Sequence, residues 1–173
     1  MADPDDAQKS PASPVCYADE FPSEAGPTVR ELVVAPAVLA AVRAQASAHD
    51  LGKVIVESLD VVYAHLRSVH VQHLGRNVVM YLSDALEVEI GVEVAGEFFP
   101  GGPIIRTSTP GGLAASTTHY GPYSTLSGAH TAVRRWCADR RRNTGIAWEV
   151  YGDWNDDPSH LRTDVFYQLL PAP

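Results

Sequence analysis

The chain has 173 residues, of which 45% are hydrophobic and 20% charged, with 13 Lys and Arg against 21 Asp and Glu. This length and composition are those of one globular domain with a hydrophobic core, and no apolar run approaches the roughly 20 residues that cross a bilayer. Because the formal net charge is −8, the chain lacks the excess of positive charge that phosphate binding requires, and direct nucleic-acid binding is disfavoured.

Residues 1–27 differ in composition from the rest of the chain. They contain five prolines and six acidic residues against one lysine, and they have no apolar segment of a secretory signal. We therefore expect a mobile acidic tail that is dispensable for ligand binding, followed by a folded domain over residues 28–173 in a cytoplasmic protein. The two cysteines, Cys16 and Cys137, lie in the tail and in a helical pattern, which argues against a disulfide or a zinc site.

The first part of the domain shows strand patterns around one long helix. The helix is predicted over Leu51–Arg67, where apolar residues recur at steps of three and four, and Asp50 stands at its N-cap position. β-rich or alternating sequences predict strands over residues 29–34, 38–44, 78–82 and 86–95.

The second part repeats the same order of patterns. A helix is predicted over Ser124–Arg141, with Ser124 as its cap and with Asn143 and Gly145 beyond its end. Strands are predicted over residues 113–119, 147–151 and 163–170, and the PGGP and TPGG sequences at 100–103 and 109–112 predict turns.

The order of these elements predicts an α+β fold with an internal repeat. Two strand–helix–strand–strand modules would form one antiparallel sheet that carries two long helices. Aligning the two modules matches Tyr81 with Tyr151 and Val79 with Glu149. A cleft at the pseudo-twofold interface between the modules is the expected place for a ligand.

Several short motifs of the second module resemble those of the GyrI-like family. They are His-Tyr-Gly-Pro-Tyr at 119–123, the helix that carries Trp136, Trp-Glu-Val-Tyr at 148–151, and the final strand. This family includes the effector-binding domains of AraC- and MerR-type transcription regulators and free-standing gyrase-inhibitor-like proteins. The resemblance spans about residues 28–170, although the final strand lacks the proline usual near Gln168.

The resemblance implies that Glu149 lies in a ligand pocket and attracts cationic, lipophilic molecules, with Tyr151 beside it. Alternation along a strand puts both side chains on one face. A buried carboxylate costs several kcal/mol unless it is paired, and a ligand cation would relieve that cost. The alternative is that this glutamate faces solvent, as most strand glutamates do. Further candidates for pocket walls, for which plain core packing is the alternative, are Tyr63, Tyr81, Tyr123 and Phe166.

Three functions remain open at this stage. The first is a sensor or sequestering protein for cationic aromatic molecules, acting in transcription regulation or drug resistance and through a protein partner, because no helix-turn-helix is visible. The second is a hydrolase of strained electrophiles in which Glu149 is the general base. The third is a haem binder of the SOUL type. No independent nucleophile–base pair is visible, so a binding protein without cofactor is favoured over an enzyme. The spacing of His65, His70 and His73 fits no metal site.

Overall fold

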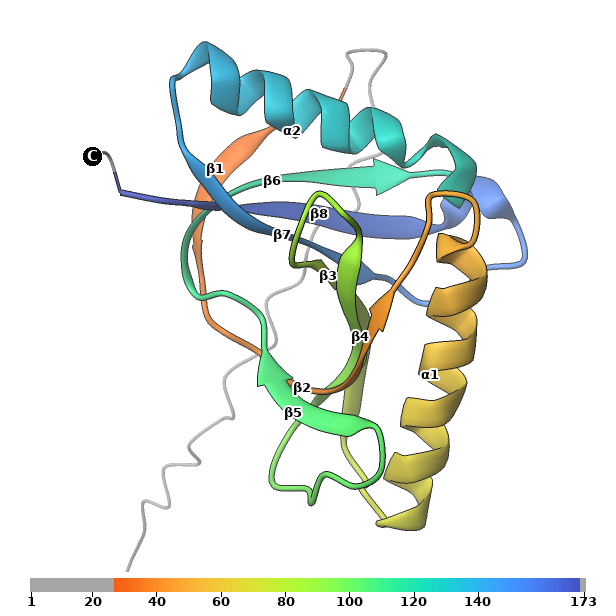
Figure 1. Cartoon of the computed structure of the whole chain (residues 1–173). Helices are drawn as coiled ribbons and strands as arrows, with labels where there is room; N and C mark the ends of the chain where they lie inside the picture. The colour runs from red at the N-terminus through yellow and green to blue at the C-terminus, as the bar shows by residue number, and fades with distance from the viewer. Residues whose placement is uncertain (1–26, 172–173) are drawn as a thin grey trace, which may run out of the picture.

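The computed structural model describes residues 27–171, and the predicted tail therefore lies outside the described residues (Figure 1). The strands are β1 (Arg30–Val34), β2 (Val38–Gln45), β3 (Leu74–Tyr81), β4 (Glu87–Val94), β5 (Ile104–Ser108), β6 (Gly112–Tyr120), β7 (Thr144–Tyr151) and β8 (Arg162–Leu169). The helices are α1 (Leu51–Ser68) and α2 (Ser127–Asp139), and the 3-10 turns are η1 (Tyr123–Thr125) and η2 (Pro158–His160). The fold is α+β, as predicted.

The predicted repeat is present. The first module is β2-α1-β3-β4 and the second is β6-α2-β7-β8, joined in one antiparallel sheet of order β1-β6-β8-β7-β3-β4-β2-β5. Exchanging the two modules gives the same strand order read in reverse. The modules meet where β3 pairs with β7. In that pair Val79 lies opposite Glu149. Because the repeat also matches Val79 with Glu149, the pseudo-twofold axis passes through this residue pair.

Two short links force the sheet to curl. Residues 35–37 join β1 to β2, and residues 109–111 join β5 to β6, although each link connects strands six positions apart in the sheet. In a flat sheet those strands would be about 29 Å apart, and a three-residue link reaches only about 14 Å. The links run side by side in Figure 1. The amide of Ala37 in the first link donates to Thr109 Oγ1 in the second at 2.8 Å.

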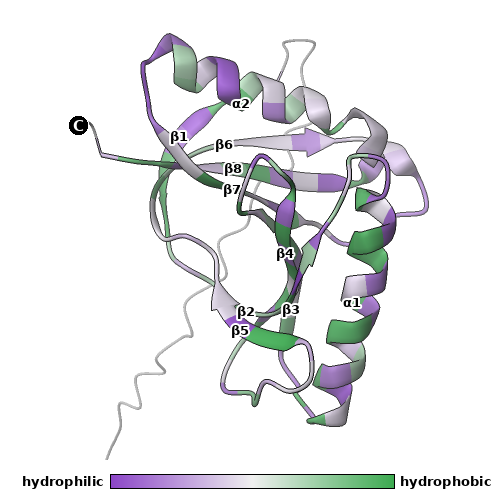
Figure 2. Ribbon diagram, viewed as in Figure 1, coloured by the Kyte–Doolittle hydropathy of each residue, from purple (hydrophilic) through white to green (hydrophobic). Residues whose placement is uncertain are grey.

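Both helices pack on one face of the curled sheet. Helix α1 covers strands of the first module and α2 covers β6 and β8, and apolar residues of each helix pack in the core beneath it. Figure 2 shows hydrophobic and hydrophilic residues interleaved along both helices. On the other face, side chains from strands of both modules form a second core, which contains Leu39, Met80, Ala114 and Trp148. Within the described residues, no helix is long and apolar enough to cross a membrane.

The structure moves several predicted boundaries, including both ends of α2 and the starts of β3 (Leu74 rather than 78) and β7 (Thr144 rather than 147), and adds one strand. Helix α2 begins at Ser127 rather than Ser124, because Pro122 starts the separate turn η1, and it ends at Asp139, just before Arg141 takes a left-handed φ of 51°. Strand β5 was not predicted, since its five residues stand between two turn sequences. It pairs with β2 and so forms an edge of the sheet.

Candidate functional site

Glu149 is the centre of the candidate site. It lies on β7 with its side chain on the helix-bearing face, and only 2% of the residue is exposed. Its Oε1 accepts a hydrogen bond from the Tyr81 hydroxyl at 2.9 Å and lies 2.7 Å from His130 Nε2. Its Oε2 accepts from the Tyr151 hydroxyl at 2.5 Å. The buried carboxylate is therefore held by three side chains.

The pseudo-twofold symmetry explains why two tyrosines reach the same carboxylate. Tyr81 and Tyr151 occupy equivalent positions in the two modules, each two residues beyond the Val79–Glu149 pair on its own strand. Strand alternation turns both rings towards the helices, as it does Glu149. The axis position thus combines one carboxylate from the second module with a phenol from each module.

Helix α2 supplies a side chain that we did not predict from the sequence. His130 Nδ1 lies 2.9 Å from the Tyr167 hydroxyl, so the imidazole bridges Tyr167 and Glu149. The ring also makes edge contacts with Tyr81 and Tyr167, with centroids 5.8 and 5.7 Å away. A signal was present, since His130 follows Leu126 by four residues and so lies on the apolar face of the helix.

These side chains line a cavity of about 1010 Å³, which we call the axis cavity. Its walls come from both helices and from β3, β7 and β8. Four of the predicted residues line it, namely Glu149, Tyr81, Tyr123 and Tyr151. The other lining residues include Leu51, Ile55, Leu82, Leu86, Leu126, His130, Arg134, Ile146 and Tyr167. The charged residues of the lining are Glu149, Asp84 and Arg134, a formal net charge of −1, and with the tyrosines and aliphatic side chains they form a surface that suits an apolar cation.

Two predicted residues do not join the others. Tyr63 packs within the core beneath α1, where its hydroxyl donates to Asn77 Oδ1 at 2.7 Å. Phe166 lies on the opposite face of the sheet, where its ring stacks on Trp148 with centroids 5.1 Å apart. Neither residue lines the axis cavity. The alternation of β8 could have separated Phe166 from its neighbour Tyr167, which does line it.

His65, His70 and His73, whose spacing fits no metal site, form no metal cluster within the described residues. His65 Nε2 lies 2.9 Å from the carbonyl oxygen of Phe99, beyond the reach of the axis cavity. Across residues 27–171, no three His, Cys, Asp or Glu side chains are grouped so that they could hold a metal ion.

The tyrosines of the axis cavity are stabilised in their neutral form. Burial, together with the negative charge of Glu149, raises the pKa of Tyr81 and of Tyr151 well above the ordinary value of 10.0. Burial also raises the pKa of Tyr123 and of Tyr167. The hydroxyls that face Glu149 therefore remain hydrogen-bond donors at every pH at which a ligand would normally be tested.

These raised pKa values predict a loss of stability at high pH. Below about pH 10 the phenols are protonated in both states, and their pKa shifts have no effect on the pH dependence of unfolding. Above it the unfolded chain loses protons that Tyr81 and Tyr151 keep in the folded protein, so each should lower the free energy of unfolding by about 1.4 kcal/mol per pH unit.

Urea denaturation between pH 8 and pH 11.5 measures how steeply the free energy of unfolding falls as the pH rises. The double variant Y81F/Y151F should make it shallower by about 2.7 kcal/mol per pH unit. Y120F, which alters a tyrosine that is 39% exposed, is the control and should leave the slope unchanged. An identical slope in the double variant and the wild type would show that the two phenols titrate alike in both states.

No protein-family model matches the chain, and no curated protein sequence matches it. Several solved structures do match the chain. The crystal structure of the EcmrR C-terminal domain has a TM-score of 0.73 at 17% identity and covers 84% of this chain and 99% of its own. A hydrolase from Listeria innocua has a TM-score of 0.58 at 9% identity, covering 84% of this chain and 93% of its own.

A third similar structure contains a small molecule. SAV2435 bound to tetraphenylphosphonium has a TM-score of 0.51 at 9% identity, and the match covers 84% of this chain and 94% of that one. Identities this low establish the fold and leave the ligand of the chain open. The chain has the GyrI-like fold that its motifs predict, the fold of the EcmrR C-terminal domain.

Proposed function

We propose that the protein binds a lipophilic organic cation in the axis cavity and acts as a sensor or a sequestering protein for it. The observation that carries this proposal is Glu149, a carboxylate with 2% exposure that faces a cavity of about 1010 Å³. Charged groups in such surroundings interact more strongly than in water, because the effective dielectric constant is lower. A cation that enters the cavity gains this interaction together with apolar contact.

Hydrogen bonds from neutral groups can account for every contact of the Glu149 carboxylate. A neutral imidazole satisfies both contacts of His130, with Nε2–H donating to Glu149 and Nδ1 accepting from the Tyr167 hydroxyl. The two tyrosines that reach the carboxylate are neutral donors as well. In this arrangement three side chains orient the Glu149 carboxylate at the wall of the axis cavity.

Aromatic rings are the second feature of the axis cavity that favours a cationic ligand. Tyr123 and Tyr151 meet edge to face with centroids 5.4 Å apart, and Tyr81 and Tyr167 flank His130. Each ring face that a cation reaches contributes roughly 0.5–2 kcal/mol. The SAV2435 structure, which has the same fold, is bound to tetraphenylphosphonium, and this ion is therefore the first probe to test.

Tetraphenylphosphonium and tetraphenylborate form a matched pair of probes, since they share shape and size but have opposite charges. We expect the phosphonium to bind and to raise the melting temperature, with about 2.7 kcal/mol of added stability at 100 times its Kd. The borate should bind at least roughly tenfold more weakly, a difference of about 1.4 kcal/mol. Isothermal titration calorimetry measures both constants, and equal affinities would refute recognition by charge.

A second candidate function is hydrolysis of a strained electrophile. The contact of 2.7 Å between Glu149 and His130 favours it, because a carboxylate paired with an imidazole can accept a proton from an attacking water. The Listeria innocua protein of the same fold is described as a hydrolase. Turnover of an epoxide or cyclopropane probe that disappears in E149Q would support hydrolysis, whereas binding without turnover favours the sensor.

A further inference from the structure

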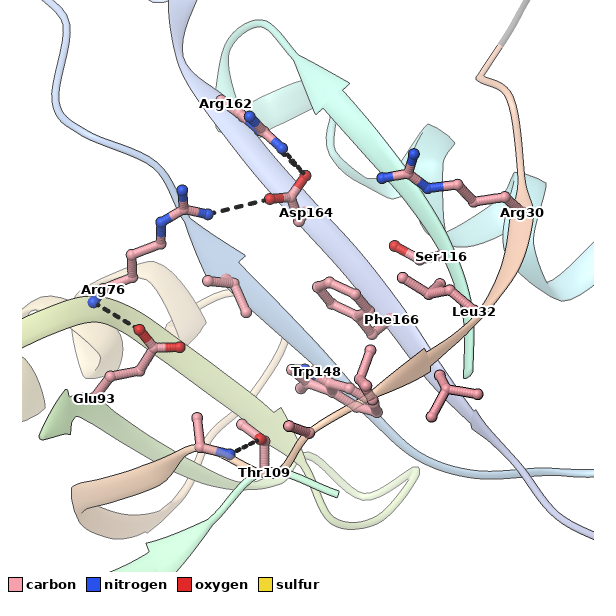
Figure 3. A pocket seen from close by; sticks show the side chains of 15 residues that line it. Arg30, Leu32, Arg76, Glu93, Thr109, Ser116, Trp148, Arg162, Asp164 and Phe166 are labelled. Atoms are coloured by element: carbon pink, nitrogen blue, oxygen red, sulfur yellow. Dashed lines mark hydrogen bonds and ion pairs between the residues drawn. The ribbon is translucent and has the colours of Figure 1, made fainter. Parts of the chain in front are cut away.

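A second cavity lies on the opposite face of the sheet from Glu149. It has a volume of about 450 Å³, within the range of small-molecule sites, and we call it the arginine cavity. Trp148 and Val150 alternate with Glu149 and Tyr151 along β7, so the two cavities lie back to back across one strand. Figure 3 shows its lining side chains, which include Arg30, Arg76, Arg162, Asp164, Trp148 and Phe166.

Positive charge exceeds negative charge among these side chains. Asp164 is buried and lies 3.4 Å from Arg76 Nη1 and 3.1 Å from Arg162 Nη2. Its Oδ1 also accepts from the Thr118 hydroxyl at 2.6 Å. One carboxylate is thus shared by two guanidinium groups.

Arg30 adds a third guanidinium that no carboxylate engages. It extends from β1 into the arginine cavity, towards the side on which Asp164 lies (Figure 3). Among the described residues it has no hydrogen-bond or salt-bridge partner. The other acidic residue of the lining, Glu93, accepts from the backbone amide of Arg76 at 3.1 Å. With three arginines against Asp164 and Glu93, the lining carries a net charge of +1.

The remainder of the arginine cavity is mostly apolar, with Thr109 and Ser116 as its uncharged polar residues. The rings of Trp148 and Phe166 lie nearly parallel, 8° apart, and form a stacked pair beside the cationic groups. Leu32 and Val34 of β1 line the cavity as well. A guanidinium group binds a carboxylate through paired parallel N–H donors, and an aromatic surface accepts a planar ring.

We propose that the arginine cavity binds a small aromatic carboxylate, with its anionic group on Arg30 and its ring against the Phe166–Trp148 pair. This site is separate from the axis cavity, takes a ligand of the opposite charge, and does not depend on the function proposed above. Arg76 and Arg162 act by holding Asp164, so that the carboxylate of the ligand meets positive rather than negative charge.

The probe is 2-naphthoate, titrated into the full chain by calorimetry with tryptophan fluorescence as a second readout. We expect saturable binding with one site per chain and partial quenching of the tryptophan emission, to which Trp148 contributes together with Trp136 and Trp154. The neutral isostere 2-naphthamide should bind at least roughly tenfold more weakly, because it keeps the ring and loses the charge. Equal affinity for acid and amide, or no binding of naphthoate at millimolar concentration, would overturn the proposal.

Two substitutions test whether naphthoate binds in the arginine cavity. R30Q should weaken naphthoate binding at least roughly tenfold and leave the melting temperature unchanged, because Arg30 is exposed and unpaired within the described part of the chain. R67Q, at an exposed arginine of α1, is the matched control and should bind like the wild type. If naphthoate binding is unaffected by R30Q but strengthened by E149Q, the anion occupies the axis cavity and the proposal is wrong.

Discussion

Replacing Glu149 with Gln is expected to weaken tetraphenylphosphonium binding at least roughly tenfold, or about 1.4 kcal/mol. The side chain keeps its shape and loses the negative charge that faces the axis cavity. A neutral molecule of similar shape, such as triphenylphosphine oxide, should lose much less affinity. Calorimetry on both variants and both ligands separates charge from shape.

A matched control exists for this substitution. Glu89 is also 2% exposed, but it lies on β4 outside the axis cavity, where it is paired with Arg43. E89Q should therefore leave the phosphonium affinity within about twofold of the wild type. Unchanged affinity for the phosphonium in E149Q would contradict the role of Glu149 as the group that receives the ligand charge.

The structure also changes the stability expected of E149Q. Removing a buried carboxylate that had no partner would be expected to stabilise the fold. In the structure Glu149 has contacts with Tyr81, Tyr151 and His130, and a glutamine amide would turn a donor towards groups that themselves donate. We therefore expect a loss of about 1–3 kcal/mol rather than a gain, measurable by urea denaturation.

The second large effect is expected at Val79, the symmetry partner of Glu149. Val79 is fully buried and lies directly opposite Glu149 on the neighbouring strand. V79E would add a second carboxylate next to the first, while the nearby donors are already engaged. An unpaired buried charge costs at least about 3 kcal/mol, and a marginal domain can lose its fold at that cost.

A neutral variant isolates the charge effect at this position. V79Q has the size of V79E without its charge, and overpacking alone should cost it about 1–3 kcal/mol. The gap in stability between V79E and V79Q should shrink when Glu149 is also replaced with Gln, since the repulsion between the two carboxylates is then removed. Denaturation curves of the four proteins give this coupling, and a gap that does not change would place the two side chains out of contact.

Much of the fold could be predicted from local patterns. The helical periodicity of residues 51–67 and the alternation around Glu149 specify an element type and a face, and these depend on nearby residues only. The edge strand β5 could not be predicted in this way, because its five residues obtain their β-conformation by pairing with β2. Its existence depends on the curl of the whole sheet.

The candidate site was predictable to the extent that it follows strand alternation. Glu149 and Tyr151 share a face by their spacing, and the repeat places Tyr81 beside them. Helix spacing and strand alternation put His130 and Tyr167 on inward faces of α2 and β8, but their contact depends on how α2 lies over β8. Tyr63 was assigned to the pocket for its residue type alone, and the rotation of α1 directs it to Asn77 instead.

The strand order has a consequence for how the protein folds. The pairing of β1 with β6 joins Arg30 to Ser116, and the pairing of β3 with β7 joins Val79 to Glu149, so both contacts close long loops. Chains dominated by such distant pairings fold slowly, in milliseconds to seconds. Glu149 meets Tyr81 only after the two modules have docked. We therefore expect the candidate site to be among the last features to form, and a bound ligand would stabilise the folded state.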